Sequence, residues 1–230
     1  MAGPRKLAGC YPAFATWQKC SEKLHFLTII SERAFMNATH INTVINGDCT
    51  HVLPQLATGS VDFVLTDLPH VNRYASSDGR TIPSGNFAWL KPAFAELGRV
   101  LKPDALCVCF YGWAHIARLS AAFRDAGFRP VGHFVFPKRW TSGTRFVRYQ
   151  HEVAFLLAKG EPKEPACPIG DVIEWADYTG NKLHPSQKPV TILLPLLEAF
   201  TQPGNVVLDP FAGSGSTLLA AKMLGRAYVG

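Results

Sequence analysis

The stretch Val206-Val-Leu-Asp-Pro-Phe-Ala-Gly-Ser-Gly-Ser-Thr217 decides the fold, because an apolar strand-like run, a glycine-rich turn and a helix-like run follow one another. Gly213 and Gly215 let the backbone approach a ligand that a side chain would exclude. The N–H groups at the start of the following helix can then face that ligand. This order is typical of a nucleotide-type cradle at the end of a strand, and it indicates an adenosine-like ligand.

Two other interpretations of this stretch compete with the cradle. A phosphate-binding P-loop needs a Lys directly before its Ser or Thr, and here Gly215 is followed by Ser216 and Thr217. The P-loop is therefore disfavoured. A plain connection between a strand and a helix also contains glycines, so the stretch alone leaves ligand binding open.

A second strand-like run, Val61 to Leu65, leads into Asp67-Leu-Pro-His70. Open α/β sheets place their sites outside the carboxyl ends of the strands, where a carboxylate beside a rigid proline and a flat ring would be held. Taken alone, Asp67 would more often be an ordinary turn residue. Two strand-end motifs in one chain, however, predict one shared crevice.

Five segments follow one another in an informative order. They are Ile45-Asn-Gly-Asp48, Asp67 to His70, Trp89 to Phe94 with Arg99 to Pro103, His184-Pro-Ser-Gln-Lys-Pro189, and Asp209 to Gly215. In this order they resemble the β-type DNA amino-methyltransferases, which transfer a methyl group from S-adenosylmethionine to an exocyclic base nitrogen. The resemblance covers about residues 41 to 230. It implies a Rossmann-like α/β fold with a mostly parallel twisted sheet, helices on both faces, and the permuted order in which the catalytic motif precedes the cofactor loop.

The resemblance also implies roles for individual residues. The catalytic motif is Asp67, Leu68, Pro69 and His70, and the S-adenosylmethionine site contains Asp48, Lys188, Asp209, Phe211, Gly213 and Gly215. The lone pair of an exocyclic amine is delocalised into the base, so a carboxylate at position 67 would localise that pair and aim it at the methyl group. The carbonyl before Pro69 would accept the second amine hydrogen, and the ring at position 70 would stack on a base swung out of the duplex.

Substrate choice follows from the first residue of this motif. Family members that act on cytosine N4 usually have Ser there, so Asp67 favours adenine N6. Methylation of cytosine N4 or of RNA and a DNA-binding relative without activity remain as alternatives. A partner restriction endonuclease and a homodimer are left open, and the resemblance favours a bacterial or phage-encoded protein.

Two departures from the family pattern bear on activity. Leu68 and His70 stand where the family prefers Pro and Tyr or Phe, and an imidazole offers a smaller stacking face that titrates near neutrality. An acidic residue about 20 positions after the glycine turn binds ribose hydroxyls in such folds, and the sequence stops at Gly230 before reaching it. We therefore expect a methyltransferase domain shortened at its C-terminus, with a weakened hold on base and cofactor.

Basic residues gather between Arg129 and His151, where five Lys or Arg residues occur without an acidic one. Four of these basic residues and one aromatic residue are predicted to contact double-stranded DNA. They are Lys138, Arg139, Trp140, Arg145 and Arg148. Cations neutralise phosphates and an aromatic ring supports them by stacking, so the loop at about 137–150 is the predicted DNA contact. The alternative is an ordinary solvated basic loop.

Composition agrees with one α/β domain of 36–230 preceded by an extension of unknown role at residues 1–35. The 230 residues carry a net charge of +6 and are 47% hydrophobic, enough for one good core. No apolar run reaches the length of a membrane span, and the six cysteines lack zinc-site spacing, so no metal is expected and a cytoplasmic location fits. A variable exposed loop is predicted at about 159–183.

Overall fold

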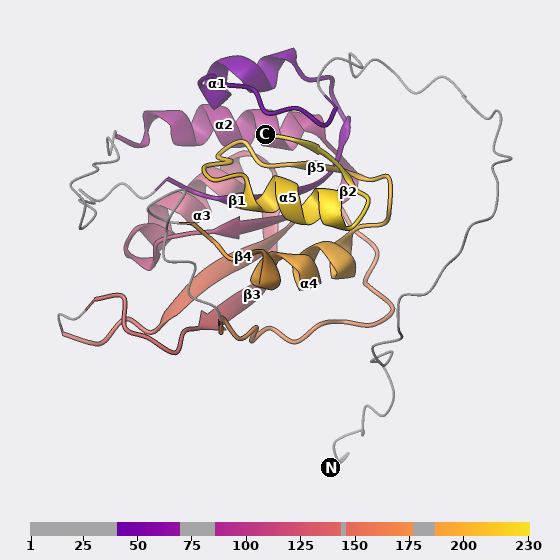
Figure 1. The fold of residues 1–230 in the computed structure, drawn as a ribbon. Helices are drawn as coiled ribbons and strands as arrows, with labels where there is room; N and C mark the ends of the chain where they lie inside the picture. The colour runs from indigo at the N-terminus through magenta and orange to yellow at the C-terminus, as the bar shows by residue number, and fades with distance from the viewer. Residues whose placement is uncertain (1–40, 70–85, 144–145, 177–186) are drawn as a thin grey trace, which may run out of the picture. The chain divides into compact units, whose positions relative to one another are not determined.

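A computed structural model of the chain describes residues 41–69, 86–143, 146–176 and 187–230. Within these residues one sheet has the strand order β3-β4-β2-β1-β5-β6 (Figure 1). The strands are β1 (Val61–Asp67), β2 (Leu101–Phe110), β3 (Phe128–Pro137), β4 (His151–Lys159), β5 (Val206–Leu208) and β6 (Ala227–Val229). The helices are α1 (Cys49–Val52), α2 (Leu90–Val100), α3 (Ile116–Asp125), α4 (Val190–Phe200) and α5 (Ser216–Met223), with 3-10 turns at Leu53–Gln55, Phe87–Trp89 and Trp113–His115.

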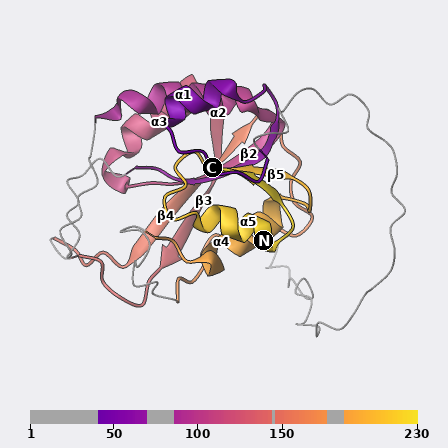
Figure 2. The same ribbon diagram turned by 45° about the horizontal axis from the view of Figure 1, so that its top comes forward.

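Helices cover both faces of the sheet, with α1, α2 and α3 on one face and α4 and α5 on the other (Figure 2). Helix α2 presents an apolar stripe at helical spacing, which consists of Leu90, Ala93, Phe94, Leu97 and Val100. Strand residues alternate between the two cores, because Cys107 and Cys109 pack with α2 and α3 while Val108 and Phe110 pack with α4. The central strands are therefore buried on both sides, as their continuous apolar runs predict.

The register of the sheet places the site. Strands β1, β2 and β5 run parallel, and Asp67 lies beside Phe110, so the carboxyl ends of β1 and β2 share one edge. Strand β4 is antiparallel to β2 and pairs Ala154 with Phe110, so β4 starts at this same edge. The hairpin that joins β3 to β4, residues 138–150, consequently projects from the edge that carries Asp67.

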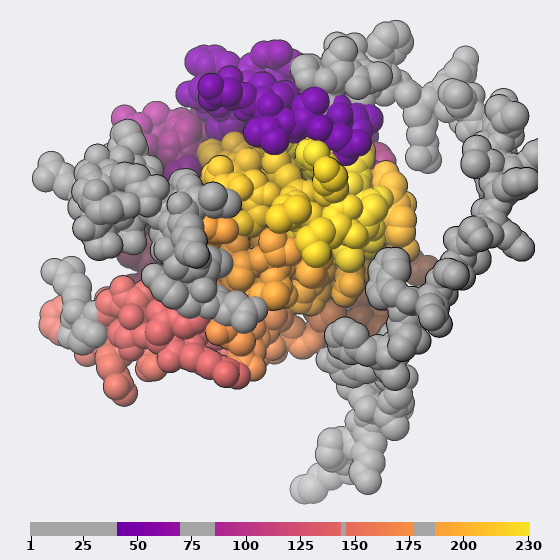
Figure 3. All heavy atoms as spheres, in the orientation of Figure 1, coloured from indigo at the N-terminus to yellow at the C-terminus, as the bar shows by residue number. Residues whose placement is uncertain are grey.

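Most of the predicted elements are confirmed within a few residues of their ends, as is the antiparallel pair at one side of the sheet. The sequence also predicts a strand at Thr43 to Ile45, and this prediction is wrong, because only an isolated parallel bridge between Thr43 and Val229 forms there. The backbone turns at Asn42, whose left-handed φ of 60° lies outside the extended conformation of a strand, so the segment enters residues 43–45 from a turn. This segment still borders β6 through hydrogen bonds from Ile45 N to Gly230 O and from Gly230 N to Thr43 O (Figure 3).

Several predictions fall on residues that the structure does not describe. They are the extension at residues 1–35, His70, Arg145 and the His-Pro-Ser part of the segment that leads to Lys188. The described part of the variable loop, residues 160–176, contains no helix or strand beyond isolated bridges at Val172 and Trp175. In the portion of the chain that is described, none of the helices combines the length and apolar character needed to cross a bilayer.

Candidate active site at the carboxyl ends of the strands

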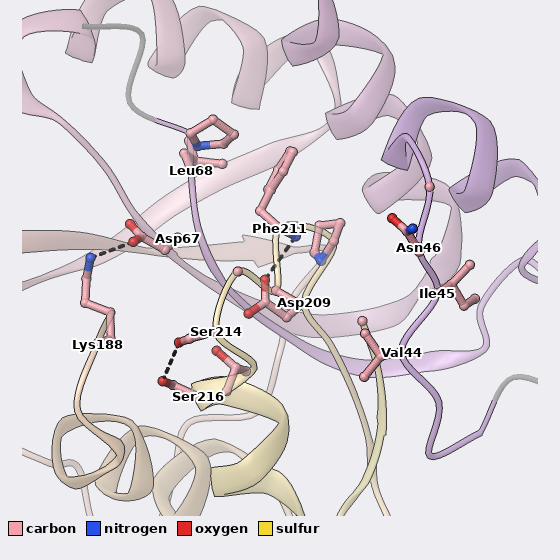
Figure 4. Close-up of a pocket in the computed structure, with 17 residues that line it drawn as sticks. Val44, Ile45, Asn46, Asp67, Leu68, Lys188, Asp209, Phe211, Ser214 and Ser216 are labelled. Carbon is pink, nitrogen blue, oxygen red and sulfur yellow. Dashed lines mark hydrogen bonds and ion pairs between the residues drawn. The ribbon is translucent and has the colours of Figure 1, made fainter. Parts of the chain in front are cut away.

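A cavity of about 470 Å³ opens at the carboxyl ends of β1 and β5 (Figure 4). Its walls come from five parts of the chain, namely residues 44–47, 67–69, Lys188, 209–214 with 216 and 217, and Gly230. The sequence predicted one shared crevice for the two strand-end motifs, and the structure brings both into this cavity. A volume of this size falls within the range of about 300–1,000 Å³ found for sites of small ligands.

Asp209 anchors the floor of the cavity. Its Oδ1 accepts hydrogen bonds from Thr66 Oγ1 at 2.7 Å and from the Phe211 N–H at 3.1 Å. Burial raises the pKa of Asp209 to about 6, and hydrogen bonds from Thr66 and Thr217 oppose that rise. A buried carboxylate held by short bonds at a strand end is preorganised to face a cation or a hydroxyl group.

The loop after Asp209 has the backbone conformation that its glycines predict. Gly213 and Gly215 have left-handed φ values of 52° and 76°, and Gly215 is the N-terminal cap of α5. Phe211 lines the cavity and packs edge-on against Trp89, with ring centroids 4.9 Å apart. Of the predicted cofactor residues, Asp209, Phe211, Gly213 and Lys188 line the cavity, whereas Gly215 shapes the loop without lining it.

The segment that contains Asp48 reaches the cavity through other residues. Val44, Ile45, Asn46 and Gly47 line it, whereas Asp48 does not. The Asp48 carboxylate instead caps α1, accepting from Thr50 N at 2.8 Å and Thr50 Oγ1 at 2.7 Å. These hydrogen bonds lower the pKa of Asp48. A cofactor contact by Asp48 stays a prediction.

Asp67 stands at the end of β1 with its two oxygens in different situations. Oδ2 is 2.6 Å from the Lys188 ammonium, which reaches up from the start of α4 (Figure 4). Oδ1 is buried and has no hydrogen-bond partner among the described residues. A buried acceptor without a donor costs free energy, roughly 1–3 kcal/mol for an uncharged group and more for a carboxylate, so Oδ1 is suited to receive a donor from a ligand.

The hairpin at 138–150 is braced by hydrogen bonds between its strands, from Lys138 N to Gln150 O and from Ser142 N to Tyr149 O. Its basic residues do not all face solvent. The Lys138 side chain is only 3% exposed and pairs with Glu152 at 2.7 Å, whereas Arg139 is 70% exposed. Arg148 is exposed near the tip.

The aromatic and basic residues predicted to contact DNA thus divide into two groups. Trp140 packs edge-on against Trp175 at 5.9 Å and Lys138 is turned into the protein, so both support the base of the hairpin. Arg139, which pairs with Glu174, and Arg148 present their charges outward. DNA contact by any of them stays a prediction.

Sequence reasoning did not identify three residues of this region. Thr66 hydrogen-bonds Asp209, and Glu152 and Trp175 lie close to the two buried lysines. Thr66 directly precedes the strand-end Asp67, and polarity in an otherwise apolar run is the one signal that could have marked it. The sequence around Glu152 and Trp175 contains no motif that would mark them as part of the site. Only the pairing of β3 with β4 and the path of the loop after β4 place them near the two lysines.

This fold and this cavity define a class of protein, and comparison with known proteins agrees. The pattern of the DNA methylase family, which covers both N6-adenine and N4-cytosine types, matches residues 61–176 and 168–230. The Escherichia coli (strain K12) protein YubD, which is named as a methylase, is 51% identical over 187 residues, covering 81% of this chain and 82% of YubD. The chain belongs to this DNA methylase family.

Solved structures show the same fold. A crystal structure of the M1.HpyAVI–SAM complex matches with a TM-score of 0.63 and 22% identity, over 81% of this chain and 91% of that one. The PvuII DNA methyltransferase, a cytosine-N4-specific enzyme, matches with a TM-score of 0.67 and 18% identity, over 81% of this chain and 79% of that one. The fold is therefore that of S-adenosylmethionine-dependent DNA methyltransferases.

Proposed function

We propose that the protein methylates adenine N6 in double-stranded DNA with S-adenosylmethionine as the methyl donor. The observation that carries this proposal is Asp67 Oδ1, a buried carboxylate oxygen without a donor among the described residues, at the rim of a cavity built on a glycine-rich loop. An exocyclic amine is a donor of the required kind. The family to which the chain belongs supplies the reaction class.

The residues of the cavity fit S-adenosylmethionine. Asp209 offers a buried carboxylate to a cation or a hydroxyl, Gly213 allows close backbone approach, and Phe211 gives an apolar surface. Asn46 provides an amide from the opposite wall. When bound, the cofactor supplies a methyl group on a sulfonium, whose positive charge suits a cavity that contains two carboxylates.

The chemistry expected of the protein at the base is orientation and acceptance of a proton. Asp67 Oδ1 would accept a hydrogen bond from the adenine amine, and the Leu68 carbonyl, directly before Pro69, would accept the other. These two bonds would turn the nitrogen lone pair toward the methyl group. The base must leave the duplex to reach the edge of the sheet, and His70 would stack on it.

The adenine assignment rests on Asp67 in place of the Ser that the cytosine-specific members usually carry. The PvuII enzyme shows that cytosine-N4 specificity occurs on the same fold, so the fold does not choose the base. The test is transfer of labelled methyl from S-adenosylmethionine to unmethylated DNA by the full 230-residue chain, with nucleoside analysis of the product. N6-methyladenine is the expected product.

Other products would refute parts of the proposal. N4-methylcytosine would overturn the base assignment and keep the reaction class. Label in RNA and not in DNA would overturn the substrate. An absence of label from folded protein that binds both S-adenosylhomocysteine and DNA would favour the inactive DNA-binding relative.

DNA is proposed to lie across the hairpin at 138–150, because this hairpin projects from the edge that carries Asp67. Replacing Arg148 with Ala is expected to weaken binding of duplex DNA at all sequences and to reduce the slope of log affinity against log salt by about 1. The physical reason is the loss of one phosphate contact and its released counterion. Fluorescence anisotropy at several salt concentrations measures both quantities.

Lys163→Ala is the matched control. Lys163 is also exposed, but it follows β4 at the opposite edge of the sheet, where β2 begins. This variant loses the same charge and is expected to keep the salt slope of the unchanged protein. Equal slopes for Arg148→Ala and the unchanged protein would remove the hairpin tip from the proposed DNA surface.

A further inference from the structure

Lys188 is buried in an unusual setting for an ammonium group. Its side chain is 8% exposed, and Nζ lies 5.3 Å from the ring centroid of Phe110 and 5.8 Å from that of Trp175. Burial lowers the pKa of Lys188, but the neighbouring carboxylates of Asp67, Glu152 and Asp209 outweigh it, so the net pKa is raised. The lysine is therefore a fixed cation in the wall of the cavity.

The contact between Lys188 and Asp67 gives the two carboxylate oxygens of Asp67 different roles. Nζ holds Oδ2 at 2.6 Å, and Oδ1 is left without a donor among the described residues. The two aromatic rings limit where Nζ can move. A carboxylate held at one oxygen has its other oxygen aimed in one direction, which is the preorganisation that a reacting amine requires.

We propose that Lys188 is a positioning residue, which fixes the Asp67 carboxylate so that Oδ1 can accept a hydrogen bond from the exocyclic amine of the target base. This inference rests on the proposed function and deepens it, because the sequence resemblance assigned Lys188 to the cofactor. As the amine nitrogen gains the methyl group and the C–S bond breaks, the sulfonium becomes a neutral thioether and one N–H proton must leave. Asp67 accepts that proton at Oδ1, and the proton leaves for solvent from the part of the carboxyl group that is exposed, since the side chain as a whole is 20% exposed.

The groups around this pair are also charged or titratable. Asp209 lines the same cavity, and Glu152 acts on Lys188 while it pairs with Lys138. Burial raises the pKa of the Cys109 thiol in β2, and the neighbouring carboxylates of Asp67 and Asp209 add to that rise. Because Asp209 itself titrates near pH 6, a pH–rate profile alone would mix two carboxylates. The titration of Asp67 has to be observed directly.

The experiment compares the full chain with Lys188→Met by carboxyl ¹³C NMR, with the Asp67 signal assigned by its absence from Asp67→Asn. Loss of the ammonium group, which lies 2.6 Å from Oδ2, is expected to move the titration of the Asp67 carbon to higher pH. The kcat for methyl transfer is expected to fall about 10²-fold, while the Kd for S-adenosylhomocysteine changes less than about threefold. Lys91→Met, which removes an exposed lysine paired with Asp125, is the control and should leave all three quantities unchanged.

A second variant covers the case in which Lys188→Met does not fold. Removing one partner of a buried ion pair leaves an uncompensated charge, so Asp67→Asn with Lys188→Met should be more stable to heat than Lys188→Met alone. Recovery of folding in this double variant would support the pairing. Failure of both variants to fold would overturn it, because Lys188 would then serve the structure independently of Asp67.

The outcomes separate this inference from the proposed function. An unchanged Asp67 titration in folded Lys188→Met would overturn the positioning role, whatever the activity. A large loss of S-adenosylhomocysteine affinity with no shift in that titration would return Lys188 to the cofactor site. If the unchanged protein transfers no methyl group, the proposed function fails, and the NMR titration still decides whether Lys188 controls Asp67.

Discussion

Replacing Asp67 with Asn is expected to reduce kcat for methyl transfer by about 10³-fold, within the range known for a positioned acid or base. The Lys188 ammonium, which lies 2.6 Å from Asp67 Oδ2, would attract the amide oxygen of the substituted side chain and turn its NH₂ group toward the position that Oδ1 now occupies. A donor would then face the donor groups of the target amine. Affinity for S-adenosylhomocysteine should hardly change, because this ligand lacks the sulfonium charge and Asp67 lies at the rim of the cavity, away from its glycine-rich floor.

Single-turnover transfer of labelled methyl measures this loss, and calorimetry with S-adenosylhomocysteine checks the cofactor site. The control is Asp125→Asn, which alters an exposed carboxylate paired with Lys91. Retention of more than a tenth of the activity by Asp67→Asn would show that the carboxylate is not the group that orients the amine.

Asp209→Asn is expected to have opposite effects on stability and on cofactor binding. Aspartate in an unfolded chain ionises near its ordinary pKa of 3.8, whereas burial raises the pKa of Asp209 in the folded protein to about 6. Between these values the unfolded chain binds fewer protons, so the free energy of unfolding falls as pH rises. About two pKa units correspond to roughly 3 kcal/mol, which the ionised Asp209 costs the folded protein above pH 6.

Urea unfolding of the cofactor-free protein between pH 4 and pH 8 tests this prediction. The Asn variant should match the unchanged protein at pH 4 and exceed its stability by roughly 3 kcal/mol at pH 8. It should also bind S-adenosylmethionine at least tenfold more weakly, because a buried negative charge has been removed from beside a cation. If the stabilities of Asp209→Asn and the unchanged protein differed by the same amount at every pH, the raised pKa of Asp209 would be contradicted. Glu164→Gln, which alters an exposed carboxylate, is the control and should follow the pH dependence of the unchanged protein.

Much of the fold follows from local patterns in the sequence. The apolar run before Asp209, the glycines after it and the helical spacing beyond them are signals within a dozen residues, and each forms as predicted. The weak point was the segment around Thr43, where a short apolar run suggested a strand. A positive φ at Asn42 and a single bridge to Val229 replace it. Asparagine adopts a left-handed φ more readily than most residues, but the bridge leaves no trace in residue type.

The site was predictable to the extent that each motif ends a strand. What the sequence could not supply is the partner of each side chain. Lys188 and Asp67 are 121 positions apart, and their contact depends on where α4 begins relative to the end of β1. Lys138 is another case, because a cluster of basic residues predicts a charged surface and does not reveal which of its members turns inward to meet Glu152.

One consequence of the cavity's charges concerns the fate of the product. Asp67 and Asp209 place two carboxyl groups in the cavity, and the Lys188 ammonium pairs with the first of them. In the proposed reaction the cofactor arrives with a sulfonium charge and departs as a neutral thioether. The attraction of the cavity would therefore weaken once the methyl group has moved, and the demethylated product would dissociate more readily than the methyl donor.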